Sequence, residues 1–216
     1  MQDTTADDPD ALVRALAQKT ALLHEVDHRV KNNLQLVSSL LLLQARRAVD
    51  PAVRDALRSA QARINAVAIV HRRLFQEEDA LQFDVAAFLE DMVEDAIGGS
   101  GRTDLHARLD LEPAELPAFQ AAPLALLVGE LLGNCVRHAF PDDRGGVITV
   151  TLVREGDQLR IEIADNGVGV ATTGANPGAG QTIVKLLCDQ LRADCQVADA
   201  HPGVQTILRL PLSGAR

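Results

Sequence analysis

Aromatic and basic residues are scarce in this chain of 216 residues. It has no Trp, no Tyr and five Phe, and its 30 acidic side chains outnumber 21 basic ones, which leaves a net charge of −9. Proteins whose main ligand is nucleic acid rely on basic surfaces for the phosphates and commonly on aromatic rings for the bases. We therefore expect no nucleic-acid partner.

Cysteines and long apolar runs are also few. Cys135, Cys188 and Cys195 lack the paired spacing of metal ligands, which predicts reduced residues packed in the core. No uninterrupted apolar run reaches the roughly 18 residues that a membrane span needs. The first residues, MQDTTADDPD, are acidic and polar, unlike a secretory or transit signal. The sequence thus predicts a cytoplasmic protein without a membrane span.

Two long helices are predicted in the first third of the chain. Asp8-Pro9 and Asp50-Pro51 each combine an N-cap residue with proline at the first helical position. We expect residues 1–8 to be disordered and residues 9–78 to form an antiparallel helical hairpin. Two helices cannot bury two long apolar stripes by themselves. A second copy would complete a four-helix bundle, so we expect a homodimer.

The first of these helices carries a histidine on its polar face. Its apolar stripe repeats at three- and four-residue steps through Val26, Val30, Leu34, Val37 and Leu41. His28 lies two residues from Val26 and from Val30, about 200° around the helix, and therefore points away from the stripe. Considered alone, His28 is an ordinary surface histidine.

The remainder of the chain, 82–213, is predicted to be an α+β domain. Helices are expected at 84–97, 123–140 and 181–192, with a break at Gly98-Gly99-Ser100-Gly101 and a loop over 113–123. Alternating or apolar segments predict strands at 105–111, 147–153, 159–164, 195–198 and 204–210. The order of these elements indicates a sandwich in which helices cover one face of a mixed sheet.

One flank of the helix from Pro123 is polar. Glu130 and Asn134 lie four residues apart and share this flank, which Arg137 and His138 continue. A carboxylate and an amide one turn apart can hold Mg²⁺, while Arg137 and His138 can approach phosphate oxygens. Taken alone, a polar helix flank usually faces water.

Two glycine-containing motifs follow. Asp165, at the end of a predicted strand, precedes Gly167 and Gly169, and such an acid can accept a hydrogen bond from an adenine amino group. The same residues also make a good hairpin turn. Gly178 and Gly180 come just before a predicted helix, whose first N–H groups can bind phosphate.

The three motifs in this order resemble the N, G1 and G2 boxes of the Bergerat (GHKL) ATP-binding fold, which histidine kinases share with gyrase. The stretch HEVDHRVKNNLQLVSSLLLLQ, residues 24–44, resembles the phosphoacceptor helix of HRxxN-type sensor histidine kinases. The related HWE subclass has a tryptophan-containing signature, which this sequence lacks.

The resemblance implies an ATP-dependent protein histidine kinase of a two-component system, with ATP and Mg²⁺ as cofactors. His28 would be the phosphoacceptor, taking the γ-phosphoryl group and passing it to an aspartate of a response-regulator receiver domain. Asn134 would bind Mg²⁺, Glu130 would help through water or as a polarising group, and Asp165 would read adenine. The other matched residues would surround the nucleotide: Arg137, His138, Gly167, Gly169, Gly178 and Gly180.

The sequence departs from the resembled pattern next to the histidine. Arg29 follows His28, where many histidine kinases carry an acid, and Glu25 and Asp27 are acids close by. Only a short polar stretch precedes the first helix, where sensor kinases usually carry an input domain, so a sensor protein acting in trans is one source of input. Two alternatives stay open: a histidine phosphotransferase or phosphatase that works without ATP, and a nucleotide-regulated dimeric binding module.

Overall fold

Two antiparallel helices form the first part of the molecule. The computed structural model describes residues 9–76, 81–142, 144–169 and 179–212, in which α1 (Pro9–Arg47) and α2 (Pro51–Gln76) make a hairpin. Asp50 caps α2, because its Oδ1 accepts a hydrogen bond from the backbone N of Ala52 at 2.8 Å. The Ser38 hydroxyl donates to Asn65 Oδ1 at 2.7 Å and so ties the two helices together. The expected disorder of residues 1–8 lies outside the described residues.

A five-stranded sheet forms the second part, in the order β2-β4-β5-β7-β6. Its strands are β2 (Leu105–Leu111), β4 (Gly146–Glu155), β5 (Gln158–Asp165), β6 (Asp194–Asp199) and β7 (Val204–Pro211). β2 pairs with β4 in parallel and all other neighbours are antiparallel, so the sheet is mixed, as predicted. A separate antiparallel pair joins β1 (Gln82–Asp84) and β3 (Glu115–Pro117).

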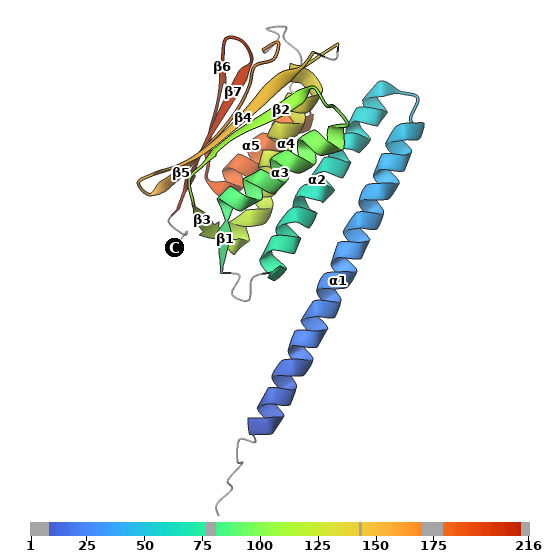
Figure 1. Cartoon of the computed structure of the whole chain (residues 1–216), viewed down its shortest axis with the longest axis vertical. Helices are drawn as coiled ribbons and strands as arrows, with labels where there is room; N and C mark the ends of the chain where they lie inside the picture. Colours follow the sequence, from blue (N-terminus) through green and yellow to red (C-terminus); the bar gives the residue numbers. More distant parts are fainter. Residues whose placement is uncertain (1–8, 77–80, 143, 170–178, 213–216) are drawn as a thin grey trace, which may run out of the picture.

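Three helices, α3 (Val85–Ser100), α4 (Ala121–Asn134) and α5 (Ala179–Leu191), cover one face of the sheet (Figure 1). Alternate residues of β4 and β5 point into this layer and are almost fully buried: Ile148, Val150, Leu152, Leu159, Ile161 and Ile163. The stretch Ala118–Ala139 is apolar and long enough to cross a membrane by composition alone, yet 61% of its most apolar window is buried inside the fold. Its apolar character is that of the central core helix.

Local structure differs from the prediction at three places. α3 continues through Gly98 and Gly99 to Ser100, and the left-handed residue Gly101 ends it, because two glycines in a last turn weaken a helix without breaking it. The expected loop over 113–123 contains β3 and a 3-10 turn, Ala118–Gln120. After Asn134 the helix widens into a π-helical turn, Cys135–Ala139.

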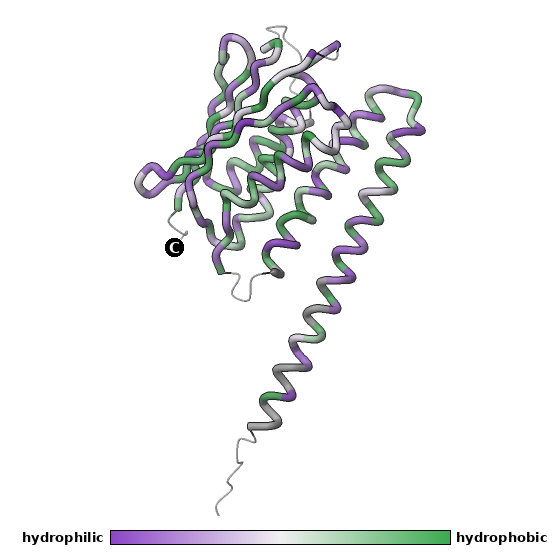
Figure 2. The backbone as a smooth tube through the Cα atoms, in the orientation of Figure 1, coloured by the Kyte–Doolittle hydropathy of each residue, from purple (hydrophilic) through white to green (hydrophobic). Residues whose placement is uncertain are grey.

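α2 lies between α1 and the sandwich. Its residues Ala66, Ile69 and Val70 are buried in the same core as the residues of α3 and α4. α1 contacts α2 along one side only, and apolar residues recur along it (Figure 2). Several large apolar side chains of α1 are therefore exposed in the single chain: Val26, Leu36, Val37, Leu40 and Leu43.

Candidate nucleotide and phosphoacceptor sites

Asp165 ends β5 and is held rigidly by backbone groups. Its side chain is 5% exposed, and Oδ1 accepts hydrogen bonds from the backbone N of Gly167 at 2.9 Å and of Val204 at 3.3 Å. Two donors from different segments, the loop after β5 and the start of β7, fix the direction of the carboxylate. Such an oriented acceptor suits recognition of an amino group on a ligand.

Two glycines allow these segments to approach Asp165 and the end of α4. A Cβ added at Gly167 would lie 2.2 Å from the carbonyl oxygen of Ala139, which accepts a hydrogen bond from the backbone N of Val168 at 2.9 Å. A Cβ added at Gly203 would lie 1.8 Å from the carbonyl oxygen of Asp165, and Gly203 has a φ of +103°. Any side chain at either position would displace the backbone around Asp165.

Cys135 lies beneath the same carboxylate. Burial, with the Asp165 carboxylate beside it, raises the pKa of the Cys135 thiol far above its usual range. The thiol stays protonated and hydrogen-bonds to Asp165. The sequence analysis treated Cys135 only as a core residue, since nothing in its spacing relates it to a residue thirty positions later.

Glu130 lies under the N-terminus of α5, between two arginines. Its side chain is 5% exposed. Oε2 accepts from Arg63 Nε at 3.2 Å and from Arg63 Nη2 at 3.1 Å, and Oε1 lies 3.7 Å from Arg137 Nη2. A Cβ added at Gly180 would lie 2.5 Å from Oε1. The sequence placed Glu130 and Gly180 in separate motifs, and the fold brings them into contact.

Arg137 joins Asn134 to Glu130. Its Nη2 donates to Asn134 Oδ1 at 2.9 Å, and burial lowers the pKa of the Arg137 guanidinium from its ordinary value. His138 follows on the π-helical turn with an exposed side chain. Although solvent reaches the side chain, desolvation of the part that packs against the protein and the charge of Arg137 lower its pKa, while Asp55 on α2 acts in the opposite direction. Turns of this type occur frequently at functional sites.

The structure thus gathers most of the predicted site at one end of α4. Gly167 follows Asp165 directly, Gly169 (φ +79°) faces Gly203, and Glu130, Asn134, Arg137 and Gly180 adjoin one another. Gly178 lies outside the described residues. Arg63 was not predicted, because it belongs to the hairpin, 67 positions before its partner.

Comparison with known proteins decides the family. Residues 25–99 match a family model described as histidine kinase, and residues 104–207 match one described as histidine kinase-like ATPase domain. The chain belongs to the histidine kinase family. Its predicted fold, a helical region followed by an α+β ATP-binding domain, is confirmed. We refer below to residues 9–76 as the hairpin and to residues 81–212 as the ATP-binding domain.

Curated relatives agree with this assignment, and a solved structure agrees with the fold. The sensor histidine kinase PdtaS of Mycobacterium tuberculosis is 30% identical over 210 residues, 92% of this chain and 41% of that protein. The blue-light-activated histidine kinase 2 of Erythrobacter litoralis is 28% identical over 199 residues, 88% of this chain and 57% of that protein. The chain therefore spans about half the length of these relatives. The histidine kinase domain from the EL346 kinase of E. litoralis superposes with a TM-score of 0.65 at 24% identity, covering 91% of this chain and 93% of that one.

The residues at this end of α4 suit the ATP that the kinase-like ATPase domain implies. Asp165 offers a fixed acceptor for an amino group, and the N-terminus of α5 offers backbone donors and the positive end of a helix dipole to phosphate. Among the described residues no cluster of three or more His, Cys, Asp or Glu could hold a metal ion. Mg²⁺ typically shares its ligands between one or two protein groups, phosphates and water, so this donor set is compatible with it.

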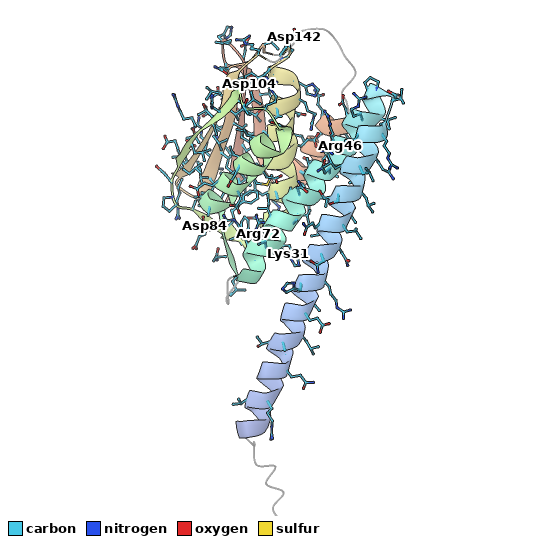
Figure 3. The ribbon with its side chains drawn as sticks, turned by 45° about the vertical axis from the view of Figure 1, so that its right-hand side comes forward. Lys31, Arg46, Arg72, Asp84, Asp104 and Asp142 are labelled. Carbon is cyan, nitrogen blue, oxygen red and sulfur yellow. The ribbon has the colours of Figure 1, made fainter. Side chains whose placement is uncertain are left out.

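His28, the predicted phosphoacceptor, is exposed on α1 and lies away from this site. Its neighbour Arg29 pairs with Glu25 at 2.6 Å, so Glu25 is engaged by a cation. Figure 3 shows Lys31, one turn beyond His28, beside Arg72 near mid-height, whereas Asp142, just after the π-helical turn, lies at the top. The structure does not bring His28 together with the nucleotide site.

Proposed function

We propose that this histidine kinase family member is an ATP-dependent kinase of a two-component system, which phosphorylates itself on His28 and passes the phosphoryl group to an aspartate of a response-regulator receiver domain. One observation carries the proposal: an oriented acid, a helix N-terminus and an Asn134–Arg137 pair form a nucleotide cradle in the same chain as an exposed histidine on a helical hairpin. A histidine held on the outer face of a helix is accessible to both donor and acceptor.

The residues have separate roles in this proposal. Asp165 accepts a hydrogen bond from the adenine amino group, and Asn134 would hold Mg²⁺, with Glu130 helping through water or as a polarising group. Mg²⁺ neutralises the charge of the phosphates. Arg137, His138 and the first amides of α5 contact phosphate oxygens, and Gly167, Gly169, Gly178 and Gly180 let the backbone close around them.

Transfer then takes place at the imidazole of His28. An unprotonated ring nitrogen forms a P–N bond with the γ-phosphorus, the bond from that phosphorus to the β–γ bridging oxygen breaks, and ADP leaves. The other ring nitrogen keeps or releases its proton to solvent. The protein contributes mainly by positioning, which requires the reacting atoms to come within about 3.5 Å.

We further propose that two copies assemble through the hairpin. The large apolar side chains exposed on α1, among them Leu36 at 60% and Leu40 at 50%, would be buried by a second copy in a four-helix bundle. We propose that the two domains extend over residues 9–78 and 82–213. We also propose a cytoplasmic location without a membrane span, and an input signal from a sensor protein in trans.

The function is tested by incubating the protein with γ-labelled ATP and Mg²⁺. Acid-labile label is expected on the wild type, and its loss is expected in His28→Ala and in Asn134→Ala. His106→Ala is the matched control, because His106 is also an exposed histidine, on β2, and its removal is expected to leave labelling unchanged. Unlabelled wild type, or full labelling of His28→Ala, would refute the proposal.

A second candidate is a histidine phosphotransferase that exchanges phosphate with a receiver domain without ATP. The observation that favours it is the distance between His28 and the nucleotide site within the chain. Wild type that stays unlabelled by ATP but takes label at His28 from a phosphorylated receiver domain would establish this alternative. Nucleotide binding without labelling in either test would indicate a binding module.

A further inference from the structure

One ion pair connects the hairpin directly to the proposed nucleotide site. Arg63, on α2, directs Nε and Nη2 to the same carboxylate oxygen of Glu130, at 3.2 and 3.1 Å. The Glu130 side chain is 5% exposed and that of Arg63 is 30% exposed, so the contact is largely shielded from water. Hydrogen bonds of this charge-assisted kind are shorter and stronger than those between neutral groups, and loss of one partner leaves the other charge buried and less well compensated.

The same contact determines where the nucleotide site lies along the hairpin. The Ser38–Asn65 hydrogen bond aligns the two helices, and Arg63 lies two residues before Asn65 on α2. At 1.5 Å per residue, His28 is about 15 Å from Ser38 along α1, on the side away from the hairpin turn, and about 18 Å from the level of Glu130. Asp55, which influences His138, lies a further 12 Å or so in the other direction.

A second copy does not remove this separation. In a four-helix bundle made by two hairpins, the twofold axis runs along the helices and leaves His28 of both copies at the same height. Transfer needs the reacting atoms within about 3.5 Å, so the ATP-binding domain must move along or away from the hairpin in either case. The arrangement described here is therefore one in which transfer does not occur.

The interface that holds this arrangement has an apolar centre with ionic contacts beside it. Its centre is apolar, where Ala66 meets α4 so closely that a Cβ added at Gly129 would lie 3.4 Å from the Ala66 Cβ. On the side toward His28, a polar groove of about 530 Å³ lies between the hairpin and the ATP-binding domain, and α1, α2 and α3 line it. Ionic contacts flank the centre, with Arg63–Glu130 on one side and Arg73–Asp91, at 2.9 Å, on the other.

We infer that Arg63 and Glu130 form a latch that keeps the ATP-binding domain in a resting position on α2 and must open before His28 is phosphorylated. While closed, the latch also engages Oε2 of the Glu130 carboxylate with Arg63. This inference rests on the proposed kinase function and deepens it, because the hairpin then regulates the site that it serves.

The first test removes the latch. Arg63→Ala is expected to raise the initial rate of His28 labelling by γ-labelled ATP about three- to tenfold, the size of effect expected for a partly shielded ion pair. Arg58→Ala is the matched control, since it removes the same charge from the same helix at an exposed position and is expected to leave the rate unchanged. A rate for Arg63→Ala that falls below wild type would overturn the latch and make Arg63 a supporting group of the nucleotide site.

The separation of α2 from α4 can also be measured without ATP or phosphoryl transfer. Ala66 is 1% exposed, so a thiol introduced by Ala66→Cys reacts with a soluble maleimide mainly when α2 and α4 separate. Adding Arg63→Ala to this variant is expected to accelerate that reaction by a similar factor, whereas adding Arg58→Ala is not. Equal reaction rates in the presence and absence of Arg63 would refute the latch even if the protein had no kinase activity.

A reversible disulfide between α2 and α4 would hold the latch closed, which is the opposite of removing Arg63. Disulfides join Cβ atoms about 3.5–4.5 Å apart, and the distance of 3.4 Å between the Ala66 Cβ and a Cβ at position 129 is close to that range. Oxidised Ala66→Cys/Gly129→Cys is expected to bind a fluorescent ATP analogue but not to label His28, and dithiothreitol is expected to restore labelling. Oxidant and reductant on the wild type control for Cys135, Cys188 and Cys195.

The outcomes separate the two ideas. Labelling of the oxidised double variant at the rate of its reduced form would overturn the latch and leave the kinase function standing. Absence of label from the wild type and from the reduced variant would refute the kinase function, and the maleimide rates would then decide whether the latch exists.

Discussion

The close approach of the β6–β7 turn to Asp165 can be tested with a single methyl group. Gly203→Ala would place a Cβ 1.8 Å from the carbonyl oxygen of Asp165 and 2.8 Å from its Oδ1. Because ordinary contacts of this kind need about 3.4 Å, the turn must move by more than 1 Å. This movement draws the backbone N of Val204 away from Asp165 Oδ1, to which it now donates at 3.3 Å.

The free-energy cost of Gly203→Ala to the folded state has two contributions. A left-handed φ of +103° at Gly203 costs an L-residue about 1–2 kcal/mol, and overlap with backbone in a packed region adds about 1–3 kcal/mol. Two other glycines separate these parts. Gly156 has a φ of +66° with no neighbour within 4 Å, so Gly156→Ala should cost only about 1–2 kcal/mol. Gly99 is helical with open space around it, so Gly99→Ala should gain about 0.5 kcal/mol.

The assay is thermal unfolding of the three variants with and without ATP and Mg²⁺. At about 2–4 °C per kcal/mol, Gly203→Ala should lower Tm by about 4 °C or more, Gly156→Ala by less, and Gly99→Ala should raise it slightly. Gly203→Ala should also lose most of the Tm increase that the nucleotide produces, and Gly156→Ala should keep it. Equal losses in Gly203→Ala and Gly156→Ala would refute the close approach to Asp165.

Three further predictions concern side chains of the site and the core. Asp165→Asn keeps an oxygen for the backbone donors of Gly167 and Val204 but offers an amide instead of a charged acceptor, so ATP affinity should fall about 10- to 150-fold with little change in Tm; unchanged affinity would exclude Asp165 as the adenine acceptor. The pKa of His138 is lowered by partial burial and by Arg137, so the unfolded chain takes up this proton first as pH falls below about 6.5, and stability declines until pH passes the folded pKa. In urea unfolding, His138→Gln should therefore lose less stability than wild type between pH 7.5 and pH 5.5, and parallel losses would contradict this assignment. Burial raises the pKa of the Cys188 thiol from 9.0 to about 12, so its alkylation by iodoacetamide at pH 8 should be about a hundredfold or more slower in the native protein than in urea; similar rates would show that Cys188 is not shielded.

Much of the fold follows from short-range signals in the sequence. Asp50 caps α2 as its position before Pro51 predicts, and alternation along β4 and β5 places Ile148, Val150, Leu159 and Ile161 in the core as predicted. Helical spacing also predicts that His28 is exposed. The sequence did not predict β3, because this strand depends on contacts far apart in the chain. Glu115–Pro117 pairs with Gln82–Asp84, more than thirty positions earlier.

In the candidate site, too, some residues could be predicted from local sequence and others could not. Glu130, Asn134 and Arg137 share a helix flank by spacing alone, and Asp165 with Gly167 follows a strand that alternation predicts. The roles of Cys135, Gly203 and Val204 depend on segments that meet only after the sheet has formed, so no local pattern identifies them.

By itself, then, the sequence determined the two kinds of domain, the exposed histidine and the motifs of an ATP site, because each depends on the periodicity or chemistry of neighbouring residues. Only the tertiary structure decided how the domains lie against each other. The Arg63–Glu130 pair joins residues 67 positions apart, and the separation of His28 from the nucleotide site follows from how α2 packs on α4. Both features depend on which faces of the two domains are buried against each other. Close packing selects one such arrangement.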